Sequence, residues 1–142
     1  MKGETIVRLI KVFLAGLLLS GLLGSGGSFG ATASHPTRTN SGGGVTVKVT
    51  PLDSKNTGDL RFQVVLDTHS VNLDSFDLKT LAVLRDATGN TYQPTSVESK
   101  GSGHHRQSTV TFAKLTSNVK RIELVIKGVA GVKERVFLWD LE

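Results

Sequence analysis

The stretch LRFQVVLD, residues 60–67, decides the fold class of this chain. Every second position of the stretch holds an apolar side chain, namely Leu60, Phe62, Val64 and Leu66. A period of two places alternate side chains on opposite faces of a β-strand. The stretch therefore predicts a strand with one face in a hydrophobic core and the other face in water.

The same alternation recurs at short intervals on both sides of this stretch. It predicts six further strands, at about residues 45–50, 79–85, 91–97, 110–112, 122–126 and 132–141. Polar, glycine-containing segments separate them, including the turn 53–59 and the loop 100–107. Residues 71–78 suit a crossover between sheets with one helical turn. About seven short strands without an amphipathic helix predict an all-β fold, an immunoglobulin-like β-sandwich.

The last predicted strand has apolar side chains on both of its faces. Val136 and Leu138 share one face, and Phe137, Trp139 and Leu141 share the other. Such a strand is expected either to be covered on both sides or to present an apolar patch to a partner.

Residues 1–33 have the three parts of a secretory signal peptide. Lys2, Arg8 and Lys11 are basic, residues 12–23 (VFLAGLLLSGLL) are mostly apolar, and ATA at 31–33 fits the cleavage pattern. We therefore predict cleavage after residue 33, export, and no stable membrane span afterwards. The alternative is an uncleaved anchor, although the apolar run is short for a bilayer core of about 30 Å.

The next segment, residues 34–44 (SHPTRTNSGGG), is small, polar and rich in glycine. This composition predicts a flexible linker. The predicted organisation is therefore a signal peptide at 1–33, a linker at 34–44 and one β-sandwich domain at 45–142.

The composition excludes several classes of function. The chain has no cysteine, so it has no disulfide, thiolate metal site, cysteine nucleophile or lipoprotein anchor. Its formal net charge is +5, but three of its basic residues lie within 1–33 and the others are scattered. A nucleic-acid-binding domain concentrates its lysines and arginines on one stripe, so we expect no nucleic-acid partner.

Four side chains form a candidate metal site. Asp67 and His69 are two residues apart, so on a continuing strand they share one face. His104 and His105 lie in a loop that Gly101 and Gly103 make flexible. If this loop folds over the end of the strand, Asp67, His69, His104 and His105 could hold zinc or copper, since imidazole binds both ions.

Two alternatives remain open for these residues. Histidines in glycine-rich loops are commonly solvated, and the segment 67–70 (DTHS) has the composition of a turn that bonds its own backbone. A hydrolase is the second alternative, because Ser70 adjoins His69. The sequence has no nucleophile elbow, however, and it places no third catalytic group.

Three short segments resemble a group of small exported prokaryotic domains that are uncharacterised. These are LDTHSV at 66–71, GHHR at 103–106 and GVKERVF at 131–137. The resemblance covers about residues 45–142. It implies a prokaryotic source and a single compact module, and it brings no activity with it.

The sequence therefore predicts a non-enzymatic, exported module that has a binding or structural role at the cell envelope. It would act in the periplasm, at the cell surface or after secretion, with a protein or other envelope component as its partner. The alternative function is zinc or copper binding at the four residues named above.

Overall fold

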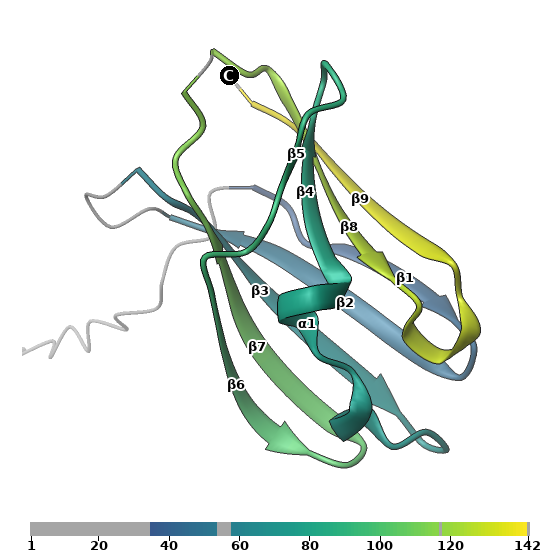
Figure 1. Cartoon of the computed structure of the whole chain (residues 1–142). Helices are drawn as coiled ribbons and strands as arrows, with labels where there is room; N and C mark the ends of the chain where they lie inside the picture. Colours follow the sequence, from purple (N-terminus) through teal and green to yellow (C-terminus); the bar gives the residue numbers. More distant parts are fainter. Residues whose placement is uncertain (1–34, 54–57, 117, 142) are drawn as a thin grey trace, which may run out of the picture.

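The computed structural model describes residues 35–53, 58–116 and 118–141, and these residues form two antiparallel sheets packed face to face (Figure 1). Sheet A has the strand order β1-β2-β3-β7-β6, and sheet B has the order β5-β4-β8-β9. The predicted all-β sandwich is confirmed. The predicted signal peptide and its cleavage site lie outside the described residues.

The strands have the following bounds. Sheet A contains β1 (Arg38–Gly42), β2 (Val45–Leu52), β3 (Leu60–Thr68), β6 (Ser96–Ser102) and β7 (His105–Phe112). Sheet B contains β4 (Ala82–Asp86), β5 (Thr91–Tyr92), β8 (Arg121–Lys127) and β9 (Glu134–Asp140). Short helices lie at Leu73–Ser75 (η2), Leu78–Leu81 (α1) and Val129–Gly131 (η3).

The described residues thus form nine strands, two more than predicted. One addition comes from the segment 91–97, which is divided between β5 in sheet B and β6 in sheet A. Pro94 lies between the two strands and has no N–H to donate to a ladder, so the chain changes sheets there. The predicted crossover at 71–78 contains η2 and leads into α1, which is capped by the Asp77 carboxylate.

The other additional strand, β1, contradicts the prediction of a flexible linker over residues 34–44. All five residues of β1 pair with β2, from Arg38 opposite Val49 to Gly42 opposite Val45. The composition of this segment concealed the strand, because none of its side chains is buried. Its order comes from backbone pairing and from two side chains of β9.

Those two side chains are Arg135 and Trp139, which we call the β9 clip. Arg135 is completely buried, and its guanidinium donates to the Asn40 Oδ1 atom at 2.8 Å and to the Gly42 carbonyl oxygen at 2.7 Å. The Trp139 indole donates to the Pro36 carbonyl oxygen at 2.8 Å. The clip therefore joins the first strand of sheet A to the edge of sheet B. Burial lowers the pKa of Arg135.

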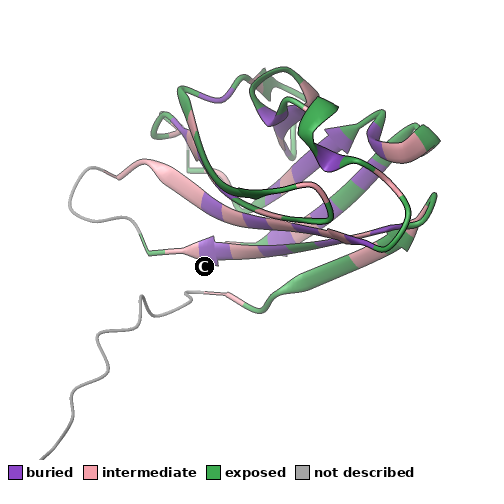
Figure 2. Cartoon of the chain, turned by 90° about the horizontal axis from the view of Figure 1, so that it is seen from below, coloured by how far each residue is buried: buried purple, intermediate pink, exposed green. Residues whose placement is uncertain are grey.

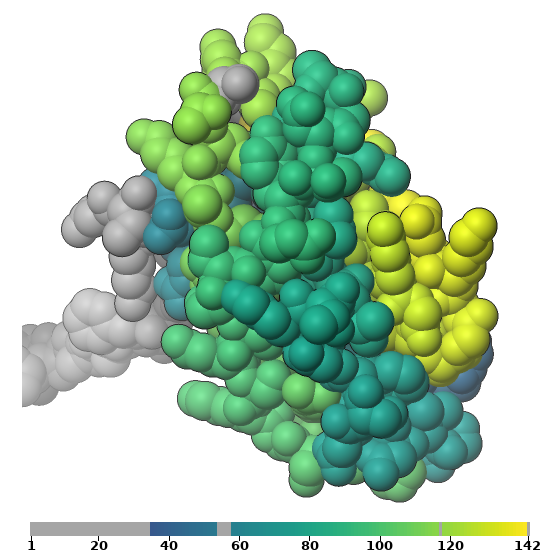
Figure 3. All heavy atoms as spheres, in the orientation of Figure 1, coloured from purple at the N-terminus to yellow at the C-terminus, as the bar shows by residue number. Residues whose placement is uncertain are grey.

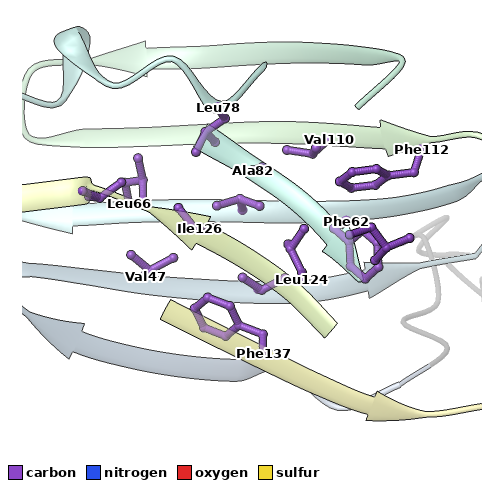
Figure 4. Close-up of a cluster of buried hydrophobic side chains, with 14 of the residues drawn as sticks. Val47, Phe62, Leu66, Leu78, Ala82, Val110, Phe112, Leu124, Ile126 and Phe137 are labelled. Carbon is purple, nitrogen blue, oxygen red and sulfur yellow. The ribbon is translucent and has the colours of Figure 1, made fainter. Parts of the chain in front are cut away.

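The inward face of the stretch at residues 60–67 forms the centre of the core, as predicted (Figure 4). Phe62 is 1% exposed, and its ring centroid lies 5.9 Å from that of Phe112 and 5.5 Å from that of Trp139. Figure 2 shows buried residues alternating with less buried ones along the inner strands, such as β2, β3 and β7.

The outer face of β9 is only partly covered. Val136 is 44% exposed and is the single exposed large hydrophobic side chain among the residues that the structure describes. Leu138 is half-buried, whereas Phe137 and Trp139 on the inner face are buried. One exposed valine is ordinary for a protein surface and forms no apolar patch.

No helix within the described ranges is long and apolar enough to cross a membrane.

Candidate functional site

The two segments of the predicted site meet at one end of the sandwich. Most of the predicted loop 100–107 belongs to two strands: residues 100–102 end β6, residues 105–107 begin β7, and Gly103 and His104 form the tight turn between them. Gly103 has φ +67°, which suits the first central position of a two-residue hairpin turn. Figure 3 shows this hairpin beside the residues that follow β3.

Three hydrogen bonds fix the hairpin turn in place. The Thr68 N–H donates to the His104 carbonyl oxygen at 3.0 Å, and the Leu73 N–H donates to the Gly103 carbonyl oxygen at 2.8 Å. The Gly103 N–H in turn donates to the Asp74 carboxylate at 3.0 Å. The backbone of the turn is therefore bonded to the end of β3 and to η2.

The strand register brings Asp67 and His105 together. Asp67 of β3 lies directly opposite His105 of β7. Because the neighbouring residues Thr68 and His104 share a backbone hydrogen bond, Asp67 and His105 form a non-hydrogen-bonded pair. Side chains approach most closely at such pairs, and the His105 Nδ1 atom is hydrogen-bonded to the Asp67 Oδ1 atom. The His105 side chain is 66% exposed, and the Asp67 side chain is 36% exposed.

All four predicted site residues line one open pocket of about 470 Å³. The lining consists of Gly44, Thr46, Asp67, Thr68, His69, His104 and His105. We call this cavity the end pocket. In the sequence, Asp67 and His69 lie more than 30 residues before His104 and His105, so the sequence alone did not show that the two pairs meet.

Thr68, not Asp67, satisfies the backbone at the turn after β3. Its hydroxyl donates to the Gly44 carbonyl oxygen at 2.7 Å and accepts from the N–H groups of Ser70 and Val71, each at 3.2 Å. The turn predicted for residues 67–70 is therefore present. It leaves the Asp67 carboxylate available to His105.

The arrangement does not form a complete metal site. Among residues 35–53, 58–116 and 118–141, no group of three or more potential ligands is placed to hold an ion. The Asp67–His105 pair nevertheless has the form that supports metal-binding histidines, in which one ring nitrogen is held by a carboxylate. A neutral His105 that donates from Nδ1 keeps a lone pair on Nε2, while His69 and His104 are exposed beside it.

The hydrolase alternative requires a hydroxyl nucleophile on the other ring nitrogen of the histidine. Within the described ranges, the hydrogen-bonding partner of the His105 side chain is Asp67, and no serine or threonine hydroxyl bonds to the ring. Ser70 instead donates its N–H to Thr68.

Sequence reasoning missed the residue that supports the pocket from below. Arg106 lies opposite Leu66 on the inner side of β7, and its guanidinium donates to the carbonyl oxygens of Leu73 at 3.1 Å and Phe76 at 2.7 Å. The sequence did contain a sign of this role. The alternation of β7 turns Arg106 toward the interior, where a guanidinium needs hydrogen-bond acceptors.

A second polar cluster, in sheet B, has a structural role. Asp86 is 6% exposed and accepts hydrogen bonds from Thr88, Asn90 and Tyr92. These bonds, led by the Thr88 hydroxyl, hold the pKa of Asp86 far below its usual range, and the carboxylate raises the pKa of Tyr92. The carboxylate closes the turn between β4 and β5.

His35 lies away from the end pocket. It lines a different pocket, of about 210 Å³, with Leu52 at the end of β2, Leu60 at the start of β3 and Leu141 after β9. These positions are at the opposite end of β3 from Asp67, so His35 serves as an internal control for the end pocket.

Comparisons with protein-family models, curated proteins and solved structures gave no match to this chain.

Proposed function

We propose that this chain is an exported, non-enzymatic binding module of the cell envelope, and that it binds its ligand in the end pocket. The observation that carries the proposal is the Asp67–His105 hydrogen bond inside a pocket whose hairpin is fixed by three further bonds. A carboxylate that orients an exposed imidazole prepares that ring to contact a ligand.

A binding role and a purely structural role for the pocket make different predictions about stability. Residues selected for ligand binding are commonly not optimal for stability. Replacing them therefore leaves the free energy of unfolding almost unchanged or raises it. We expect His69→Ala and His105→Ala each to change it by no more than about 0.5 kcal/mol in chemical denaturation. Losses above about 2 kcal/mol in both variants would assign the histidines to the scaffold and refute the binding role.

Arg106→Ala is the matched comparison for this experiment. Its guanidinium supports the backbone beneath the pocket from the interior side of the sheet. Removing a partner from half-buried carbonyl groups costs about 1–3 kcal/mol, so this variant should be clearly destabilised.

The export part of the proposal concerns the amino terminus. Cleavage after residue 33 would leave only a few residues before Pro36, whose carbonyl oxygen is bonded to the β9 clip. Mass spectrometry of the exported protein should give a mature chain that begins at Ser34. A mass that includes Met1 would show a retained anchor.

The histidines of the end pocket favour zinc or copper as the ligand. The end pocket contains three imidazoles, and Asp67 already holds the ring of one of them. We propose that His105 binds the ion through Nε2 and that His69 and His104 turn toward it, which their exposure allows. Asp67 then acts through His105 and does not contact the ion.

Melting curves with added metal test this ligand class. A ligand that binds only the folded protein raises the melting temperature by an amount that grows with its concentration. We expect zinc or copper to do so with the wild type and with His35→Ala. The double variant His69→Ala with His104→Ala should lose the shift while its metal-free melting temperature stays the same. A wild-type curve that ignores both ions up to about a millimolar refutes the metal site.

A further inference from the structure

Strand β6 forms an edge of sheet A. It pairs with β7 on one side, and in the part of the chain that the structure describes no strand pairs with its other side (Figure 1). An unpaired edge presents N–H and C=O groups that can pair with another chain. Natural edges are commonly blocked by proline or by charged side chains. Residues 96–102 contain no proline, so the charged residues Glu98 and Lys100 decide which pairings this edge allows.

The hydrogen-bond pattern identifies the groups that point outward. The pair Thr68–His104 is backbone-bonded, so the even-numbered residues of β7 bond to β3 and the odd-numbered ones face β6. In the β6–β7 register the odd residues of β7 face Ser102, Lys100 and Glu98. The N–H and C=O groups of the alternate residues, including Val97 and Ser99, consequently point away from β7.

The side chains on this edge carry charges of both signs. Glu98 and Lys100 are exposed on the outer face of sheet A, with the serine between them on the inner face. A two-fold axis pairs two copies of one strand antiparallel, and the residue at the axis fixes the register. An axis at Glu98 or Lys100 places like charges together, whereas an axis at Ser99 places each Glu98 opposite the partner's Lys100.

The register favoured by charge is also the register favoured by the backbone. With the axis at Ser99, the outward N–H and C=O groups of the two Ser99 residues meet and bond. Glu98 and Lys100 then form non-hydrogen-bonded pairs, in which side chains lie closest. We propose that β6 pairs with β6 of a second copy in this register, which joins the two A sheets into one continuous sheet.

This proposal is independent of the end pocket, since it involves neither its histidines nor Asp67. A contact along one short strand is smaller than a standard protein interface, so the dimer should be weak. Sedimentation equilibrium of the wild-type domain, up to about 1 mM, should show reversible dimerisation. A protein that stays monomeric over this range overturns the proposal.

Charge exchange tests the register. Glu98→Lys and Lys100→Glu should each abolish dimerisation, because each variant places like charges opposite one another. An equimolar mixture of the two variants should restore a heterodimer, since every facing pair again has opposite charges. The control Lys48→Glu changes an exposed lysine on a central strand of the same sheet and should leave dimerisation intact.

Backbone exchange provides an independent readout of the same register. The Val97 and Ser99 amides of the wild type should exchange more slowly with solvent as the protein concentration rises. A mixture of the two charge variants that stays monomeric, or slower exchange that maps to β1 in place of β6, contradicts the proposal.

Discussion

Replacing Phe62 by alanine tests the register of the strand on which the fold prediction rests. The ring is 1% exposed and packs against two aromatic rings, with centroids 5.5 and 5.9 Å away. Truncation of a buried phenylalanine costs about 3–5 kcal/mol through lost burial and the cavity that remains. Because both aromatic contacts contribute about 0.5–1.5 kcal/mol each, the upper part of this range is expected.

Urea denaturation of the folded domain measures this cost directly. Domains of this size have unfolding free energies of about 5–15 kcal/mol. The Phe62→Ala variant should therefore still be folded without urea only if the wild type is clearly more stable than the lower end of this range. Arg61→Ala is the matched control, because its side chain is on the opposite face, and it should change the free energy by no more than about 0.5 kcal/mol. A larger loss for Arg61→Ala than for Phe62→Ala would mean that the strand faces are inverted.

Three further predictions follow from the packing and the charges. Arg135→Met removes the guanidinium from the β9 clip but keeps an apolar stem. Hydrogen exchange should therefore accelerate selectively in residues 38–42. Uniform acceleration over the whole domain would contradict the clip. Gly43→Ala should be strongly destabilising in thermal melts, because a Cβ there would lie 2.1 Å from the Ala130 carbonyl oxygen at a φ of +59°, and an unchanged melting temperature would contradict this close contact. Asp86 has a lowered pKa in the folded state, so its contribution to stability is present above about pH 4, the unfolded value, and is lost as the pH falls further. Asp86→Asn should therefore be less stable than the wild type at pH 7, and denaturation at several pH values should show this gap narrowing below pH 4, whereas a constant gap would refute the assignment.

The alternation of apolar and polar residues was sufficient to predict the sandwich. Phe62 and Leu66 face the core, and so do Phe112 and Trp139 from strands distant in the sequence. This pattern reports the burial of side chains, so it cannot reveal a strand that buries none of its own. Strand β1 has five polar or small residues and no buried side chain, and it is held by backbone pairing with β2 and by hydrogen bonds from the buried Arg135.

The sequence held one indirect sign of β1. Arg135 lies on the inner face of β9 by simple alternation from Phe137, and a buried guanidinium requires acceptors. Identifying those acceptors as Asn40 and Gly42 needs the relative position of the two sheets. Alternation along a single strand carries no such information.

For the candidate site too, the sequence predicted the residues but not their arrangement in space. Residue type and spacing identified Asp67, His69, His104 and His105, but their meeting depends on the pairing of β3 with β7. Residues 100–107 were predicted to be a loop because their glycines were taken as a sign of mobility, whereas most of them belong to β6 and β7. Gly103 instead adopts the positive φ that a tight turn requires, and its backbone is bonded on both sides.

We propose that the imidazoles of the end pocket bind a metal ion together. The most direct measurement is a zinc titration of protein with ¹⁵N-labelled histidine rings, followed by nuclear magnetic resonance. The ring signals of His69, His104 and His105 should change together and saturate at one ion per chain, while those of His35 stay constant. Equal, unsaturable changes at all four histidines, or no change up to about a millimolar zinc, would contradict this proposal.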